Sequence, residues 1–364
     1  MKKKRVQSKV AASICLLLCI LFAFSLTGCA PSQTPDPASA PETDPETESP
    51  DDVIELKFAT WLAEVSHIGQ FWKRYGEMIE EKSEGRVKIN YYWSQGLVPM
   101  PDGKRAAQSG ITDIATIIVN FTNEEPLHGL MLLPMMGINP LSVPSIYKEL
   151  TNQFPELMEE FPGTKVIGAY CMAPSFIHTI KDEIRVPADM KGKKIICSGL
   201  NTDVVVNAGG APIALGGPDW YTSLERGMAQ GQITGFPQAN VESCLELETV
   251  HNMFDGNGLV IGMVALLINN DTWNSLPADI QEIFNEMSVW FAEEGTKVDL
   301  QESDSLVAEY KEKGHTYIYL NPEEMELWSD VVQPIHNKWI EEYSSAGPTQ
   351  AIYDEIKRLV AENK

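Results

Sequence analysis

The stretch that decides the fold is residues 187–236, PADMKGKKIICSGLNTDVVVNAGGAPIALGGPDWYTSLERGMAQGQITGF. Its short apolar runs are predicted to be three strands: 194–197, 211–215 and 232–236. The segments between these runs have the spacing of helices, and strands that alternate with helices favour parallel pairing in an α/β fold. Ligands of such sheets lie at the carboxyl ends of the strands, so the loops after Ile196, Leu215 and Thr234 are candidates for a binding site.

Three motifs in this stretch, in this order and at this spacing, resemble the solute-binding subunits of TRAP (tripartite ATP-independent periplasmic) transporters, of the dicarboxylate-binding (DctP) type. The motifs are Asp189-Met-Lys-Gly-Lys-Lys-Ile195, Asn207-Ala-Gly-Gly-Ala-Pro212, and Trp220-Tyr-Thr-Ser-Leu-Glu-Arg-Gly227 followed by Gly231. The resemblance extends from about Ile54 to Glu362. It implies an α/β, two-lobe periplasmic-binding-protein fold with crossing hinge strands and a long interlobe helix. It also implies a small organic solute as ligand and the TRAP membrane subunits as partners.

The sequence departs from the family pattern at the residues that would bind an organic acid. Ile196 stands where the family usually has the Arg that clamps a carboxylate, and a second family Arg is absent near Ser175. Gln230 replaces a usual Asp, and Thr234 falls where the family often has a ligand-binding Asn. Since an Ile cannot form a guanidinium–carboxylate pair, we expect a neutral, aromatic or cationic ligand, or an acid held by different donors.

The family default, a simple carboxylate, stays open as an alternative, with Lys104 and Arg105 in lobe one or Lys181 and Arg185 in lobe two as candidate relocated cations. For a cationic ligand, the expected partners are Glu64 and the aromatic faces of Trp61 and Trp93.

The N-terminus has the pattern of an export signal. Five basic residues lie within positions 2–9, an apolar run follows at 10–26, and Leu26-Thr27-Gly28-Cys29 resembles a bacterial lipobox. We therefore expect a lipoprotein signal peptide at 1–28, lipid on Cys29, and an extracytoplasmic, membrane-anchored protein in the periplasm or on the outer face. A single membrane span is the alternative. Residues 29–52 are rich in Pro and acidic residues and are predicted to be a disordered tether.

The charge excludes one class of partner. The full chain has a net charge of −23, and removal of residues 1–28 would leave 23 basic and 51 acidic residues, a net of −28. Nucleic-acid binding needs a cationic surface, so no nucleic-acid partner is expected. Cys171, Cys197 and Cys244 are expected to be buried free thiols, and no Cys or His spacing indicates a metal site. No cofactor is expected.

The order of predicted elements suggests how the lobes are built. Lobe one is expected to comprise residues 53–174 and 262–300, and lobe two residues 175–261. A C-terminal strand and helices at 301–364 are expected to pack across both. Helical periodicity from about 280 to Tyr310 predicts one long helix that joins the lobes.

The sequence carries no G-x-S-x-G, H-E-x-x-H or phosphate-binding loop, so we interpret it as a non-enzymatic binding protein. The alternatives are a ligand sensor for a membrane receptor and a secreted enzyme on a related scaffold. The loops after the predicted strands supply the candidate ligand-binding residues: Trp61, His67, Trp93, Asn120, Phe121, Tyr170, Ser175, Ile196, Ser198, Thr234 and Phe236.

Overall fold

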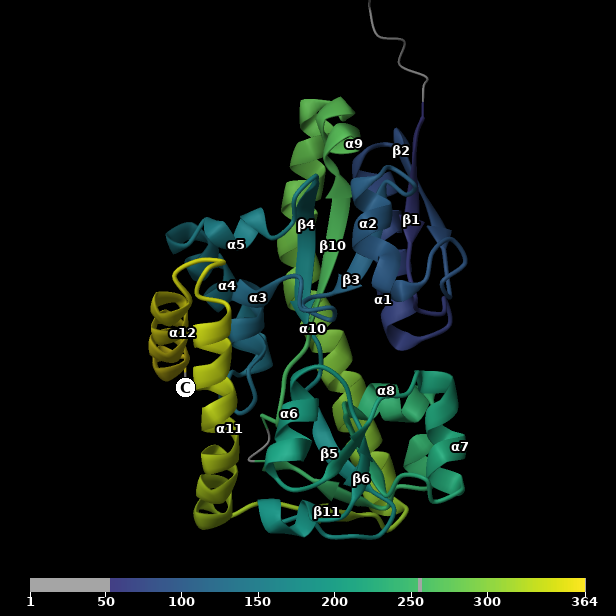
Figure 1. Cartoon of the computed structure of the whole chain (residues 1–364). Helices are drawn as coiled ribbons and strands as arrows, with labels where there is room; N and C mark the ends of the chain where they lie inside the picture. Colours follow the sequence, from purple (N-terminus) through teal and green to yellow (C-terminus); the bar gives the residue numbers. More distant parts are fainter. Residues whose placement is uncertain (1–52, 255–256, 364) are drawn as a thin grey trace, which may run out of the picture. The chain divides into compact units, whose positions relative to one another are not determined.

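The structure is a computed structural model that describes residues 53–254 and 257–363 (Figure 1). The expected signal peptide, Cys29 and the tether lie outside these residues. The strands of the described part are β1 Ile54–Ala59, β2 Val87–Tyr92, β3 Ile114–Ile118, β4 Thr164–Cys171, β5 Phe176–Thr179, β6 Lys194–Ile196, β7 Ala211–Ile213, β8 Gly231–Thr234, β9 Val250–Asn252, β10 Met263–Asn269 and β11 Thr316–Ile318. Its α-helices are α1 His67–Lys82, α2 Gly103–Gln108, α3 Pro126–Gly129, α4 Val143–Gln153, α5 Glu156–Glu159, α6 Leu200–Asn207, α7 Trp220–Glu225, α8 Phe236–Val241, α9 Asn270–Ser275, α10 Ala278–Glu312, α11 Pro322–Glu342 and α12 Thr349–Glu362.

The first sheet, which we call lobe one together with its helices, has the strand order β2-β1-β3-β10-β4. β1 pairs in parallel with β2 and with β3, whereas β10 is antiparallel to both of its neighbours. The alternating pattern Ile54-Glu-Leu-Lys-Phe-Ala59 predicts a strand, and β1 forms there with Leu56 and Phe58 buried in the core. The parallel strands β1, β2 and β3 therefore end at the same edge of the sheet.

The second sheet, lobe two, has the order β11-β9-β5-β8-β6-β7. β6 pairs in parallel with β7 and β8, as predicted for residues 187–236, and β5 is antiparallel to β8. The strand ends differ from the prediction: β6 ends at Ile196, β7 ends at Ile213, and β8 runs from Gly231 to Thr234. The largest change is at Phe236, which begins α8 instead of ending the strand. Pro237 in the first turn of α8 explains the change, because proline favours the start of a helix and cannot donate to a sheet.

Two sequence patterns predict helix starts, Ser66 before the amphipathic run at 68–79 and Asn321-Pro-Glu-Glu324, and both form caps. The Ser66 side chain accepts a hydrogen bond from the Gly69 N–H at the start of α1. Asn321 and Glu324 form a capping box at the start of α11. None of the helices within 53–254 and 257–363 combines the length and the apolar character needed to cross a membrane.

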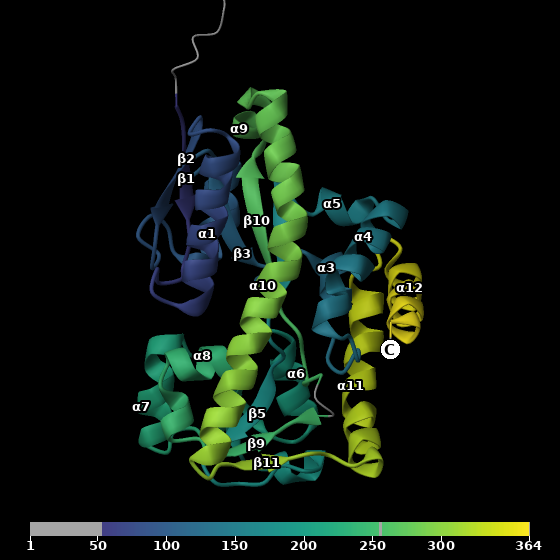
Figure 2. The ribbon, with the colours of Figure 1, turned by 180° about the vertical axis from the view of Figure 1, so that it is seen from behind.

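The long predicted helix is α10, with 35 residues. It packs along β4 and α1 in lobe one and against α8 in lobe two (Figure 2). Two glycines permit the close approach of α10 to β4. A Cβ at Gly168 would lie 2.9 Å from the Phe291 ring, and one at Gly295 would lie 2.8 Å from the Tyr170 ring. In the contact between α10 and β4, the Phe291 ring of α10 therefore faces Gly168 of β4, and the Tyr170 ring of β4 faces Gly295 of α10.

Two chain segments pass between the sheets side by side. One connects β4 to β5, and the other leads from β9 to β10. Three backbone hydrogen bonds of 2.8 Å join them. The Met172 N–H donates to Gly262 O, the Ser175 N–H donates to Val260 O, and the Leu259 N–H donates to Ser175 O. The sequence predicts the crossings at 176–180 and 259–268, but β5 and β10 pair within their own sheets, and the crossings are the segments next to these strands.

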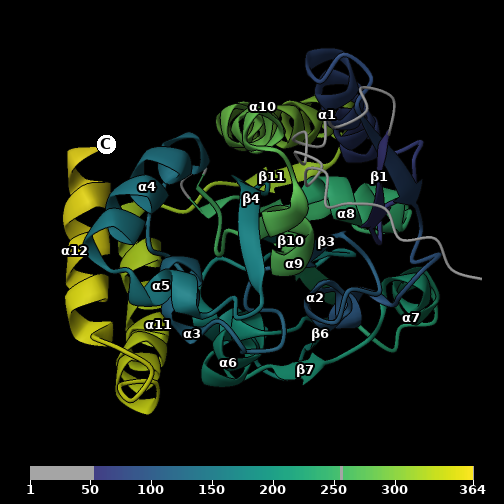
Figure 3. The same ribbon diagram turned by 90° about the horizontal axis from the view of Figure 1, so that it is seen from above.

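The C-terminal helices lie on the side of the molecule away from α1 (Figure 3). α11 has hydrogen bonds at two distant points: Trp339 Nε1 donates to Pro126 O and Trp328 Nε1 donates to Arg185 O, each at 2.9 Å. α12 packs against α4 and α11. The C-terminal segment thus contacts residues near both sheets.

Candidate functional site

Five of the sequence-predicted ligand residues lie at the carboxyl edge of the lobe-one sheet. Trp61, Trp93, Asn120 and Phe121 are on the loops after β1, β2 and β3, and His67 begins α1. Backbone hydrogen bonds join the loops after β1 and β2, from Gln95 N–H to Thr60 O at 2.9 Å and from Ser94 N–H to Leu62 O at 2.8 Å. Ser94, Gln95 and Asn120 all have a positive φ, between 52° and 61°. Non-glycine residues in this conformation concentrate at functional sites because the backbone is strained there.

The two tryptophans of this edge are half-buried and held by other rings. Trp61 meets Trp72 edge to face with centroids 5.7 Å apart, and Trp93 stacks on Tyr91 at 4.6 Å with the planes 13° apart. Fixed aromatic rings with an exposed part offer flat, apolar surface to a ligand.

After β3, Asn120 is buried and Phe121 is exposed. The Asn120 N–H donates to Glu125 Oε2 at 2.8 Å, and Glu125 Oε1 lies 2.5 Å from Lys104 Nζ. Lys104 is also 3.5 Å from Glu124. The Asn120 side-chain oxygen is buried and has no hydrogen-bond partner among the residues that the structure describes. The Lys104 charge is therefore already compensated by two carboxylates.

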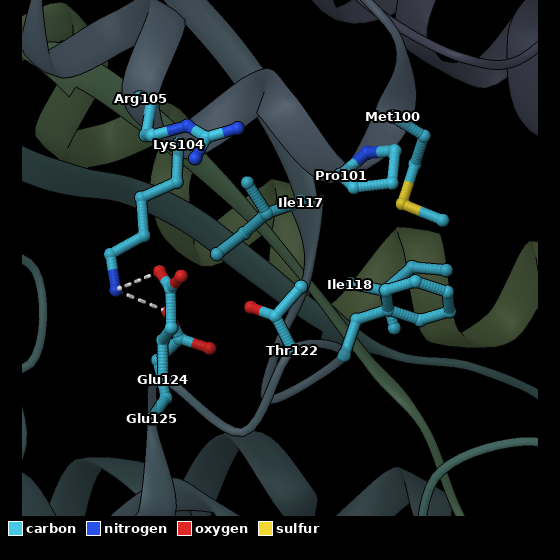
Figure 4. Close-up of a pocket in the computed structure, with 10 residues that line it drawn as sticks. Met100, Pro101, Lys104, Arg105, Ile117, Ile118, Thr122, Glu124 and Glu125 are labelled. Atoms are coloured by element: carbon cyan, nitrogen blue, oxygen red, sulfur yellow. Dashed lines mark hydrogen bonds and ion pairs between the residues drawn. The ribbon is translucent and has the colours of Figure 1, made fainter.

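Phe121 lines a small open hollow beside this ion pair (Figure 4). Met100, Pro101 and Ile118 lie on the side of the hollow opposite Lys104 and Glu125 (Figure 4). Arg105 lines the hollow too, but its guanidinium pairs with Asp102. The hollow is thus mostly apolar, with paired charges at one side.

The corresponding edge of lobe two carries Ser175, Ile196, Ser198, Thr234 and Phe236. Phe176 at the start of β5 pairs with Thr234 at the end of β8, so Ser175 and Thr234 lie at the same edge as the end of β6. Ser198 is exposed, whereas Ser175 is half-buried and both of its backbone polar groups are used in the crossing segments.

Ile196 has an exposed fraction of only 1% and belongs to an apolar cluster with Phe176, Leu224 and Phe236. Phe236 is fully buried, so it acts as core in this structure. The position at which the family usually carries an arginine is therefore buried in an apolar cluster. A buried ion without a partner is strongly unfavourable in such surroundings.

Thr234 is buried, and its carbonyl accepts a hydrogen bond from His178 Nε2 at 3.0 Å. His178 is fully buried on β5, and burial lowers its pKa to about 4. His178 was absent from the sequence-predicted set. No local pattern indicates its role, because the contact depends on the register between β5 and β8.

His67 contacts Asp299 in the middle of α10, and the Asp299 charge also acts on Tyr170. His67 Nε2 lies 2.8 Å from Asp299 Oδ1, and burial together with the Asp299 charge raises the pKa of Tyr170. Tyr170 itself is buried between Phe71 and Phe291. Sequence reasoning missed Asp299 because acidic helix residues are usually solvated. The signal was its place on the buried stripe that includes Phe291, Gly295 and Leu306.

Cys171, Cys197 and Cys244 are buried free thiols, and burial raises the pKa of each. In the part of the chain that the structure describes, no group of three or more His, Cys, Asp or Glu side chains is arranged to hold a metal ion.

Two sheets with crossing connections and a helix that spans both define a two-lobe binding-protein fold. Residues 58–342 match the family model described as bacterial extracellular solute-binding protein, family 7. The chain belongs to this family, the DctP family of TRAP solute-binding proteins, whose members are transport proteins and not enzymes.

Curated relatives and solved structures agree with this assignment. The chain is 22% identical over 301 residues to the C4-dicarboxylate-binding periplasmic protein DctP of Rhodobacter capsulatus, covering 79% of this chain and 87% of that protein. It is 26% identical over 165 residues to the uncharacterized protein YiiZ of Salmonella typhimurium, but this similarity spans only 43% of this chain and 49% of that protein.

Among solved structures, the fold is similar to a TRAP solute-binding protein of Rhodoferax ferrireducens in complex with copurified benzoate. The TM-score is 0.77 at 21% identity, over 85% of this chain and 98% of that one. A Bordetella bronchiseptica TRAP solute-binding protein with bound mandelate gives a TM-score of 0.76 at 18% identity, over 85% and 100% of the chains. At these identities, the likeness shows the fold alone.

Proposed function

We propose that this chain is the extracytoplasmic receptor of a TRAP transporter and captures a small organic solute between its two lobes. In this proposal lobe one comprises residues 53–174 and 262–300, lobe two comprises 175–261, and 301–364 brace both. Lipid on Cys29 anchors the receptor to the membrane, and the solute leaves the site chemically unchanged. The solute contacts the loops at the carboxyl edges of both sheets, because ligands of open α/β sheets bind there.

We further propose that the solute is uncharged and contains a flat ring. The observation that carries this proposal is Ile196, which is 1% exposed in an apolar cluster at the family's arginine position. Ser175, near the second family arginine, is also neutral. A buried carboxylate with no partner would cost several kcal/mol, so the lobe-two edge favours a neutral group.

Three of the candidate replacement cations are already paired with carboxylates. Lys104 is paired with Glu124 and Glu125, Arg105 with Asp102, and Arg185 with Glu324 at 3.0 Å. Recruiting any of them for a solute carboxylate would break an existing ion pair. The same reasoning argues against a cationic solute at Glu64, which already binds Lys73 Nζ at 2.8 Å.

The exposed parts of the aromatic residues of lobe one support the proposal that the solute contains a flat ring. Trp61 and Trp93 are half-buried with fixed orientations, and Phe121 is 42% exposed. Benzoate and mandelate, which the two related structures hold, are themselves aromatic. The proposed solute resembles them in its ring but lacks their carboxylate.

The test is a binding titration with matched pairs of compounds. Benzoate is compared with benzamide, and mandelate with mandelamide, because each pair keeps the ring and changes only the charge. We expect the amide to bind at least as tightly as the acid in each pair. Acids that bind more than tenfold tighter than their amides would overturn the neutral-ligand proposal, and turnover of any bound compound would overturn the receptor proposal.

A further inference from the structure

Three histidines form a hydrogen-bonded line through lobe two. His178 Nδ1 lies 2.8 Å from His251 Nδ1, and His251 Nε2 lies 3.0 Å from His315 Nδ1. His178 and His251 are directly opposite each other on β5 and β9, and His315 immediately precedes β11. His178 and His251 are fully buried, whereas His315 is half-buried. The line therefore runs from the interior of the lobe toward its surface.

The Thr234 carbonyl determines which ring nitrogen carries each proton. Because a carbonyl can only accept, His178 Nε2 must be the donor of their 3.0 Å hydrogen bond. In a neutral ring His178 Nδ1 is then an acceptor, so His251 must donate from Nδ1. His251 Nε2 becomes an acceptor in turn, and His315 must donate from Nδ1. The three hydrogen bonds together are thus compatible with only one set of tautomers, to which each of the three rings contributes.

The surroundings keep the rings neutral. The Phe236 ring lies 4.7 Å from His178 and 5.0 Å from His251, between ring centroids. Burial lowers the pKa of His251 to about 2, and burial with the nearby Lys313 charge lowers the pKa of His315.

The titratable and charged groups that face the line come from four elements. On the β8 side, Gln232 pairs with His178 across the sheet and binds Glu248, whose pKa burial raises well above its usual value. The ring centroid of Tyr317 in β11 lies 5.0 Å from that of His251. The ring centroid of Tyr310 in α10 lies 4.9 Å from that of His315, near Lys313. Burial raises the pKa of Tyr310 and of Tyr317, so both hydroxyls are neutral near pH 7, and Lys313 at the surface end is paired with Glu309 at 2.6 Å.

We propose that His178 is a positioning residue that holds the end of β8 at the solute site through the Thr234 carbonyl, and that His251 and His315 keep His178 in the tautomer this requires. The role of Thr234 in solute binding rests on the function proposed above. The hydrogen-bond line itself does not depend on any solute.

A change at the surface end should therefore reach His178, two rings away. Without the His315 donor, His251 Nε2 is free to carry the proton, and His251 Nδ1 then becomes an acceptor. His178 Nδ1 and His251 Nδ1 would then face each other as two acceptors unless His178 also moved its proton to Nδ1. That move removes the donor to Thr234.

The test is ring-nitrogen NMR on the folded protein with ¹⁵N-labelled histidine at pH 7.5. We expect His178 to carry its proton on Nε2, and His251 and His315 on Nδ1. In His315→Phe the His178 signals should shift toward the other tautomer, and the Gly235 amide should move with them, because it shares a peptide group with the Thr234 carbonyl. His315→Asn keeps a donor at the Nδ1 position and should leave both signals in place.

A His178 proton on Nδ1 in the unmodified protein would overturn the proposed direction of hydrogen-bond donation along the three histidines. Unchanged His178 signals in His315→Phe would overturn the coupling, and shifted rings with a fixed Gly235 amide would overturn the positioning role. Each of these results is independent of the titrations with acids and amides, so a failure here is distinguishable from a failure of the proposed function.

Discussion

His67 Nε2 lies 2.8 Å from Asp299 Oδ1, and the other Asp299 oxygen accepts the Ala173 N–H at 2.6 Å. One buried carboxylate thus joins the first residue of α1, the middle of α10 and the crossing segment after β4. These are the elements whose relative movement would open or close a two-lobe receptor. Asp299 is therefore the polar connection between the helix that spans the lobes and the expected hinge.

Replacing Asp299 with Ala should lower the free energy of unfolding by about 1–3 kcal/mol, because the buried Ala173 N–H loses its acceptor. Asp299→Asn keeps an acceptor and should lose less. Asp304→Ala, at an exposed position on the same helix, is the matched control and should be within about 0.5 kcal/mol of the unmodified protein. Urea unfolding measures all three, and equal losses for Asp299→Ala and Asp304→Ala would contradict this role.

Ile196→Arg should destabilise the protein by several kcal/mol, because it places a charge inside an apolar cluster. Ile196→Leu should cost less than about 1.5 kcal/mol, since it conserves volume and polarity. Thermal unfolding of the two variants gives the comparison. If Ile196→Arg folded with unchanged stability and gained affinity for benzoate, the position would face the solute and would not be core.

Glu248 and Gln232 form a buried pair whose contacts indicate a protonated acid. Gln232 Nε2 donates to Glu248 Oε2 at 2.6 Å, while Glu248 Oε1 and Gln232 Oε1 both lack a partner in the described residues. A proton on Glu248 Oε1 would supply the missing donor. Burial raises the pKa of Glu248 well above its usual value, which agrees with a neutral acid at neutral pH.

This pair gives a pH dependence with a definite sign. Above the unfolded-state pKa near 4.5, the unfolded Glu248 loses its proton while the folded one keeps it, so the residue's contribution to stability falls as pH rises. Glu248→Gln does not titrate, and its stability relative to the unmodified protein should increase from pH 5 to pH 8, by at most about 1.4 kcal/mol per pH unit. Urea unfolding across this range measures the difference, and a constant difference would show that folded Glu248 is ionised.

Cys29→Ser should release the protein from the membrane or leave its precursor uncleaved, because serine cannot form the thioether to lipid. Cell fractionation with mass measurement of the N-terminal peptide distinguishes these results from normal anchoring. Mature Cys29→Ser protein that still fractionates with the membrane would refute the lipobox interpretation.

The sequence predicted the features that depend on local patterns. The alternating β1, the Ser66 and Asn321 caps and the parallel β6, β7 and β8 follow from periodicity and capping chemistry. The anomaly at Ile196 was also visible, although its burial was not. Sequence reasoning also assigned Phe236 to a strand end, but the structure makes it a fully buried helix residue.

Features that depend on long-range register were beyond the sequence. His178 and His251 become neighbours only when β5 pairs with β9, and Glu248 reaches Gln232 only through the turn before β9. Asp299 looked like one more acidic residue of a solvated helix until α10 was placed against β4. Each of these groups is polar and buried, and in each the partner that makes burial tolerable is distant in the chain.

The central claim is a receptor whose site takes a neutral, ring-containing solute, and the most direct measurement is native mass spectrometry of the purified mature protein. The copurified solute would be released, its mass determined and its acidity measured. We predict a ring compound without a carboxylate that raises the free energy of unfolding by about 2.7 kcal/mol when added at one hundred times its Kd. Recovery of a simple carboxylate such as benzoate or a C4-dicarboxylate, bound tightly at neutral pH, would contradict the claim.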